Sequence, residues 1–225
     1  MLKVKPHPDY PVEEGRYLRG NDFSPVAVVI ILITDADKIA PDITRLVMAG
    51  LESGAALSGT LQTANLGLEK IISNIVANPN IRVLVLGGPE SLGHQTGDAV
   101  KALLKNGIDD KRRIVETTAK SAALYNVPIE LIDRFRKQIT LVDCQFQEEP
   151  VVRKAVWSCI QEAPVDFRGQ SLFDPGAFPE PPLGRKLIVS VTQPWAEPLD
   201  DNERAAKEKA MAMVELLRKR QVKRQ

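Results

Sequence analysis

The sequence predicts an α/β fold: a Rossmann-like, mainly parallel sheet flanked by helices, with a C-terminal extension. Residues 26–33 form an unbroken, largely β-branched apolar run, which is typical of a strand covered on both faces. Residues 65–78 carry the clearest amphipathic helical pattern of the chain. Strand-like and helix-like segments then alternate as far as about residue 161, and this alternation indicates βαβ units around a parallel sheet.

The first half of the chain is expected to form two strands and two helices. The strand over 26–33 is followed by a helical pattern over 41–53, which Gly54 ends. Residues 55–58 can form a short second strand. Asn65 is a suitable N-cap for the second helix, and the Asn78-Pro79 pair ends that helix because proline disfavours helical geometry in the residue before it.

The second half repeats the alternation. A strand over 81–86 ends at consecutive glycines, and a helix over 96–106 ends at Gly107, the residue type that favours a helix C-terminus. The later elements expected are a short strand near Ile114, a helix over 129–137, a strand over 139–142 and a helix over 150–161.

The domain organisation follows from composition. Residues 1–24 are rich in proline and glycine and are predicted to be an irregular arm, residues 25–170 the Rossmann-like domain, and residues 171–225 a C-terminal extension. A proline- and glycine-rich linker over 163–185, an edge strand over 186–191 and a charged helix opened by Asp200 are expected near this end.

Composition excludes several classes of function. A net charge of +1 and an aromatic content of 5% give no reason to expect a nucleic-acid partner. No secretory signal and no apolar stretch of membrane-spanning length is visible, so a cytoplasmic protein without a membrane span is expected. Cys144 and Cys159 form no C-x-x-C pair and are interpreted as small apolar side chains.

Ligands of open α/β sheets bind beyond the carboxyl ends of the strands, which selects the loops 59–65 and 87–97. The second loop contains His94, one of two histidines in the chain. A lone loop histidine is more often an ordinary hydrogen-bonded or exposed residue than a ligand. A zinc site needs more donors than this loop offers, whereas a corrinoid supplies its own equatorial nitrogens and needs only one axial donor from the protein.

Other chemistries find less support. No dinucleotide fingerprint, phosphate loop or G-x-S-x-G elbow is present. Asp35, Asp37 and Asp42 could form a Mg²⁺ pocket of a hydrolase, although acidic residues are also favoured at a helix start. The D-x-H-x-x-G cobalamin motif is only half matched, because Leu92 occupies the aspartate position before His94 and Gly97.

Several segments together resemble one family, the corrinoid-bearing A-type subunit of tetrahydromethanopterin S-methyltransferase. The resemblance covers about residues 10–178 and rests on Leu57-Ser-Gly59, Asn65-Leu-Gly-Leu-Glu-Lys70, Asn78-Pro-Asn-Ile-Arg82, Gly88-Pro-Glu-Ser-Leu-Gly-His-Gln-Thr-Gly97, Lys105-Asn-Gly-Ile-Asp109 and Asp174-Pro-Gly-Ala-Phe178. Members of the family end in a membrane helix, which this chain lacks, so the resemblance is to a homologue without that anchor.

The resemblance implies a cobalamin-binding methyl carrier. His94 would be the axial cobalt ligand, and a methyl group would pass from a methyl-tetrahydropterin through cobalt to a thiol such as coenzyme M. Partners would be methyl-donor and methyl-acceptor proteins or substrates. The alternative is a non-catalytic α/β binding or regulatory module that has lost corrinoid chemistry. The candidate cofactor-binding residues are Gly59, Thr60, Thr63, Asn65, Gly87, Gly88, Glu90, Gly93, His94, Thr96 and Gly97.

Overall fold

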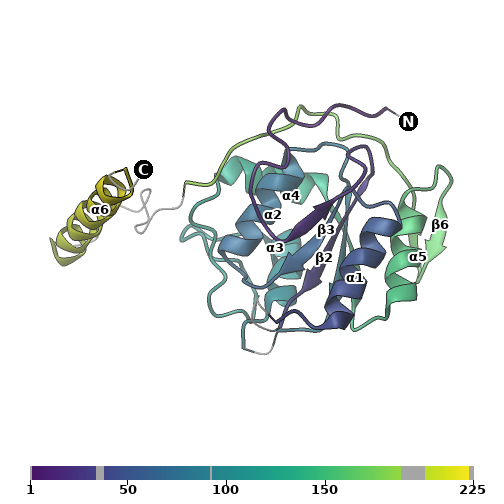
Figure 1. Cartoon of the computed structure of the whole chain (residues 1–225), viewed down its shortest axis with the longest axis horizontal. Helices are drawn as coiled ribbons and strands as arrows, with labels where there is room; N and C mark the ends of the chain where they lie inside the picture. The colour runs from purple at the N-terminus through teal and green to yellow at the C-terminus, as the bar shows by residue number, and fades with distance from the viewer. Residues whose placement is uncertain (1, 34–37, 92, 189–200, 223–225) are drawn as a thin grey trace. The chain divides into compact units, whose positions relative to one another are not determined.

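The computed structural model describes residues 2–33, 38–91, 93–188 and 201–222. The chain divides into two units, Met1–Leu187 and Ile188–Gln225. The first unit is an α/β fold built on a five-stranded mixed sheet of order β1-β3-β2-β4-β5 (Figure 1). The predicted fold class is therefore confirmed.

Four strands of this sheet are parallel. They are β2 (Val26–Ile31), β3 (Leu57–Leu61), β4 (Val83–Gly88) and β5 (Thr140–Gln145). β2 lies in the centre, pairing with β3 on one side and with β4 on the other. Every residue of β2 and β4 is buried, which explains the continuous apolar run in the sequence.

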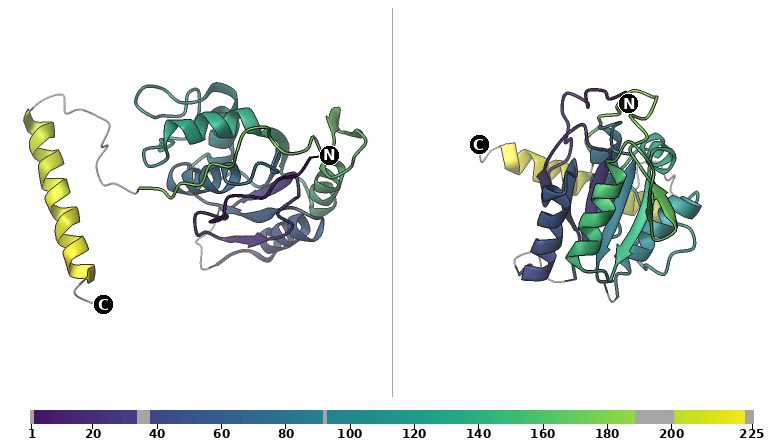
Figure 2. Two further views of the ribbon diagram at one scale, coloured as in Figure 1. Left: turned by 90° about the horizontal axis from the view of Figure 1, so that it is seen from above. Right: turned by 90° about the vertical axis from the view of Figure 1, so that its right-hand side faces the viewer.

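Helices cover both faces of the sheet (Figures 1 and 2). α1 (Pro41–Glu52) and α5 (Glu149–Cys159) pack together on one face, where they bury Val28, Ile30 and Val85. α2 (Leu66–Val76), α3 (Thr96–Asn106) and α4 (Ile129–Gln138) cover the other face and bury Leu84, Leu86 and Phe135. The sheet thus lies between two hydrophobic cores, as in a doubly wound fold.

The predicted irregular arm contains a strand. β1 (Tyr17–Arg19) pairs antiparallel with β3, and the preceding side chains of Tyr10 and Val12 are buried in the core. No signal for β1 is visible in the sequence, because a three-residue edge strand is too short to show an alternating pattern.

Two further predictions need correction. The linker expected over 163–185 begins with a hairpin of β6 (Val165–Phe167) and β7 (Gln170–Leu172), whose turn has Arg168 and Gly169 at positive φ. The positive φ values of Arg168 and Gly169 suit a tight two-residue hairpin turn.

The strand expected near Ile114 is absent from the described residues. Ile114 makes only an isolated bridge to Ile108, and Arg113 makes one to Ala123.

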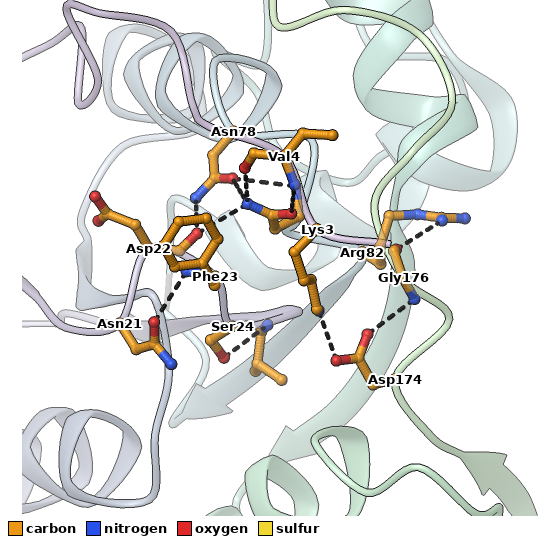
Figure 3. Close-up of polar contacts among 12 residues, drawn as sticks. Lys3, Val4, Asn21, Asp22, Phe23, Ser24, Asn78, Arg82, Asp174 and Gly176 are labelled. Atoms are coloured by element: carbon orange, nitrogen blue, oxygen red, sulfur yellow. Dashed lines mark hydrogen bonds and ion pairs between the residues drawn. The ribbon is translucent and has the colours of Figure 1, made fainter. Parts of the chain in front are cut away.

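The amino ends of the strands are closed by a polar network (Figure 3). The Asn80 side-chain oxygen accepts from the Val4 backbone N–H at 3.0 Å, and the Asn80 side-chain N–H donates to the Val4 carbonyl at 2.7 Å. Arg82 donates to the carbonyl of Gly176 at 3.3 Å, and its guanidinium lies 5.2 Å from the ring centroid of Phe178. Two of the segments that carry the family resemblance, 78–82 and 174–178, therefore meet here and are structural.

The second unit contains α6 (Asp201–Val222), whose described side chains are mostly exposed. Among the described residues, no helix combines the length and the apolar character that crossing a bilayer requires. Asp35, Asp37, Leu92 and Asp200, together with residues 189–191 of the expected edge strand, lie outside the described ranges.

Candidate functional site

The loop that carries His94 lies at the topological switch point of the sheet. The chain leaves β2 toward β3 and leaves β4 toward β5, so the connections after the two central strands run in opposite directions. Open α/β sheets bind ligands in the crevice beyond the carboxyl ends of such a strand pair. The segment between Gly88 and α3, which includes His94, follows β4 at this point.

His94 is exposed at the tip of this loop. Its backbone N–H donates to the Ser91 carbonyl at 3.1 Å, while its imidazole makes no hydrogen bond or ion pair with any residue that the structure describes. Gly93 has φ +91°, and a Cβ added there would meet nothing within 4 Å. The exposed imidazole is therefore next to a residue that has no side chain and has open space on its Cβ side.

Glu90 closes the loop onto the start of α3. One carboxylate oxygen accepts from the backbone N–H groups of Ser91 at 2.8 Å and Gly97 at 3.0 Å, and the other accepts from Asp98 at 2.9 Å. The N–H groups at the helix start have no partner within the helix, and a carboxylate is also favoured by the helix dipole at this end. Glu90, one of the candidate cofactor-binding residues, thus holds both ends of the loop.

The start of α3 is also tied to the two flanking strands. The Thr96 hydroxyl is fully buried and donates to the Gln62 carbonyl just beyond β3, at 3.3 Å. Lys101 donates to the Gln145 side chain at the end of β5, at 2.7 Å. A Cβ on Gly97 would collide with the side chains of Gln145 and Glu90, so a larger residue there would have to displace both.

Asp98 joins the same helix end to the long segment between α3 and α4. Its carboxylate accepts from the Thr117 hydroxyl at 2.7 Å and from the Thr118 backbone N–H at 2.7 Å and hydroxyl at 2.9 Å. Burial alone raises the pKa of this carboxyl, but the bonds from Thr118 and Thr117 outweigh it, so the pKa is lowered. Asp98 is thus held ionised next to the His94 loop.

The other predicted loop is organised differently. Asn65 caps α2 by accepting from Leu66 N–H at 2.8 Å, and the Thr63 hydroxyl accepts from Gly67 N–H at 3.0 Å. Gly59 is opposite Tyr17 of β1, and Thr60 N–H donates to the Arg16 carbonyl at 2.9 Å. Asn65 and Thr63 therefore shape α2, while Gly59 and Thr60 hold the edge strand.

Gly59, Thr60 and Thr63 line a cavity of about 300 Å³ between residues 14–17, β3 and α2. None of the described residues of 87–91 and 93–97 belongs to its lining. The structure therefore brings Glu90, Gly93, His94, Thr96 and Gly97 together, and it places Gly59, Thr60 and Thr63 around a separate cavity. Gly87 and Gly88 lie against Ile30 of β2, which leaves little room for a side chain on either.

A metal site built from several side chains is not present in the parts of the chain that the structure describes. Asp42 of the expected acidic cluster is exposed in the first turn of α1, where it pairs with Arg45. Cys144 and Cys159 are both fully buried in the core between the sheet, α1 and α5. This placement agrees with their interpretation as apolar side chains.

Sequence reasoning missed Asp98, Lys101, Gln145 and Phe146. The strand expected over 139–142 extends to Gln145, so the carboxyl end of β5 was placed too early. Asp143 and Gln145 are polar strand residues, and their polarity masked the continuation of the strand. Pairing with β4 up to Gly88 is the constraint that the sequence alone could not supply.

Comparisons with known proteins give one consistent result. The family described as the A-type subunit of tetrahydromethanopterin S-methyltransferase matches residues 3–183. The relative named as the second A-type subunit of that enzyme in Methanothermobacter thermautotrophicus is 40% identical over 189 residues, covering 83% of this chain and 92% of the relative. Its counterpart from Methanothermobacter marburgensis is 38% identical over 182 residues, covering 80% and 86%. The first A-type subunit from M. thermautotrophicus is 37% identical over 180 residues, covering 79% and 66%.

Proposed function

Because the chain belongs to the family of the A-type subunit of tetrahydromethanopterin S-methyltransferase, we propose that it binds a corrinoid at the carboxyl edge of its sheet. With the corrinoid bound, the protein would serve as a methyl carrier, and His94 would be the axial cobalt ligand. The observation that carries this proposal is the placement of His94, an exposed imidazole without a protein partner among the described residues, at the switch point between β2 and β4. Ligand sites of open α/β sheets lie at this point.

The donor set fits a corrinoid better than a bare metal ion. A corrin ring supplies the equatorial nitrogens, so a single protein imidazole completes the coordination. A bare ion would need several donors, and the described residues around His94 offer no such cluster. Gly93 leaves space beside the imidazole, which a broad planar ligand requires for close approach.

When bound, the cobalt of the corrinoid would supply a nucleophile for a methyl group, received from a methyl-tetrahydropterin and delivered to a thiol such as coenzyme M. His94 would hold the ligand through its imidazole, and a hydrogen bond accepted from the other ring nitrogen would orient the imidazole and raise its basicity. The relatives are named as subunits of an enzyme, so methyl-donor and methyl-acceptor partners are part of the proposal.

The residues around His94 would position it. Glu90 fixes both ends of the loop, and Thr96 joins α3 to the loop after β3. Ligating histidines usually donate their second ring N–H to a carboxylate, a carbonyl or water. Three backbone N–H groups already occupy three of the about four acceptor positions of the Glu90 carboxylate, so we propose that a backbone carbonyl or solvent accepts from His94.

The test is reconstitution of the purified protein with hydroxocobalamin, followed by desalting and visible spectroscopy. We expect the wild type to retain the corrinoid with an axial-imidazole spectrum, and His94→Ala to keep its fold but lose that spectrum. His7→Ala is the matched control, since His7 is the other histidine and lies in the N-terminal segment. An unchanged spectrum in His94→Ala would refute the ligand assignment. No retention by the wild type would favour the non-catalytic binding module.

A further inference from the structure

Phe146 combines two unfavourable features in one residue. It follows β5 directly, its φ is +61°, and its side chain is 71% exposed. A positive φ is uncommon for non-glycine residues and is a genuine outlier for a bulky one. An exposed phenyl ring also leaves a large apolar surface in water.

The turn explains the backbone but not the side chain. Phe146 N–H donates to the Gly88 carbonyl at 2.9 Å, and Gln147 N–H donates to Cys144 at 3.2 Å, so the chain turns sharply between β5 and α5. Glycine or asparagine would adopt this geometry with less strain. The fold therefore gives no reason for a phenyl ring at this position.

Exposure alone is not unusual, because single apolar side chains are common on protein surfaces. Phe23 is 47% exposed and Trp157 is 50% exposed, yet neither has a positive φ. The other non-glycine residues with positive φ among the described parts of the chain are polar or charged: Gln95, Arg112, Glu116 and Arg168. Phe146 is distinguished by having both properties.

Its position relates the ring to the candidate site. Phe146 is bonded to Gly88, the last residue of β4, from which the chain continues into the His94 loop. On the other side of β4, Ile33 lies beyond the end of β2 and is 55% exposed. Two large apolar side chains thus flank the strand that carries the His94 loop, on the edge where ligands of this fold bind.

We propose that the ring of Phe146 packs against the apolar periphery of the bound corrinoid and positions it over His94, which makes Phe146 a positioning residue of the site. This inference rests on the proposed function. Backbone strain is retained at ligand-binding positions where the surrounding structure enforces it. Burial of the ring by the ligand would account for a side chain that the protein fold itself does not use.

The test compares Phe146→Asn and Phe146→Gly with the wild type, in corrinoid titration and in thermal unfolding of the ligand-free protein. Both variants relieve the strained backbone, so we expect an unchanged or higher unfolding temperature. We expect the dissociation constant for hydroxocobalamin to rise at least about fivefold, with the axial-imidazole spectrum kept at saturation. Phe146→Leu, which restores apolar surface, should recover part of the affinity.

Phe23→Asn is the matched control, because Phe23 is an exposed phenylalanine at the opposite, amino edge of the sheet (Figure 3). It should leave the dissociation constant unchanged. A lower unfolding temperature in both Phe146→Asn and Phe146→Gly would mean that the ring packs against the protein, and the inference would be wrong. Affinities within about twofold of the wild type would also overturn it.

The two proposals fail in different ways. If the wild type itself retains no corrinoid, the proposed function fails and this inference with it. If the wild type binds and His94→Ala loses the axial spectrum while Phe146→Asn binds normally, only this inference fails. If Phe146→Asn binds the corrinoid with normal affinity but transfers methyl groups more slowly, the ring would contact a partner protein and not the corrinoid. That result would also contradict this inference.

Discussion

Glu90 accepts a hydrogen bond from the backbone N–H of Gly97 at 3.0 Å, across the loop whose tip presents His94. The same carboxylate also binds Ser91 and Asp98, so one side chain both caps α3 and closes the loop. The position of the imidazole therefore depends on a residue whose hydrogen bonds all go to the backbone of the loop and of α3.

Replacement of Glu90 should weaken the helix start and the ligand site together. Glu90→Ala removes the acceptor for three backbone N–H groups, and we expect a loss of about 1–2 kcal/mol in the free energy of unfolding, measured with urea. Glu90→Gln keeps one acceptor and should cost about half as much. A free energy within error of the wild type for Glu90→Ala would contradict the capping role.

Gly97→Ala should be destabilising although it places a better helix former in a helix. The new Cβ would collide with Gln145 and with the Glu90 carboxylate, and we expect a cost of about 1–3 kcal/mol. Gly67→Ala is the matched control at the corresponding position of α2, where the nearest atom is the Thr63 hydroxyl at 2.9 Å, on an exposed side chain. Urea unfolding should show the smaller loss for Gly67→Ala, and equal losses would argue against the close packing at Gly97.

Asp98 should make stability depend on pH in the acid range. Its pKa is lowered in the folded chain, so its contribution is complete above the unfolded value of about 3.9 and disappears as the pH falls through the lower folded value. We expect Asp98→Asn to be less stable by under about 1 kcal/mol at pH 7, since the carboxylate is partly exposed. The difference from the wild type should shrink below pH about 4.

The control for this prediction is Asp133→Asn, an exposed carboxylate on α4. At pH 7 its free energy of unfolding should lie within about 0.5 kcal/mol of the wild type, as is usual for an exposed surface substitution. If the Asp98→Asn difference stayed constant between pH 7 and pH about 3, the hydrogen bonds from Thr117 and Thr118 would not be the source of the lowered pKa.

Both cysteines should be unreactive in the folded protein. Burial raises the pKa of the Cys144 thiol to about 11 and that of the Cys159 thiol to about 12, and the thiolate is the reactive form. At pH 8 we expect an aromatic disulfide reagent to label both thiols at least about 100-fold more slowly in buffer than in denaturant. Rapid labelling of one thiol in the native state would show that its side of the core opens locally.

The central elements could be predicted well because they are buried on both faces or strongly amphipathic. The strand expected over 26–33 is observed over 26–31, two residues shorter, and the helix beginning after Asn65 lies where its pattern places it. The edges were less visible: β1 is too short to carry a pattern, and β3 covers 57–61 rather than 55–58 because its register follows from pairing with β2. Local sequence does not contain that pairing information.

The candidate site shows the same division. His94 and the glycines around it were visible as a motif. Gln145 ends a strand that is a neighbour of β4 only in the folded chain, and Phe146 follows that strand. Glu90 was singled out correctly as a residue of the loop, but its backbone partners become apparent only when α3 is in place. Contacts between segments that are distant in the sequence were therefore the part that the sequence did not reveal.

The shortness of β1 has a consequence for the behaviour of the protein at high concentration. Without β1, one side of β3 would offer a row of unpaired backbone groups, on which another chain could add a strand and start aggregation. β1 occupies that row with only three residues and ends in Arg19, whose guanidinium is bound by Asp22. The outer side of β1 offers only three residues for pairing, which is too short for a stable template, so the strand limits edge-to-edge association.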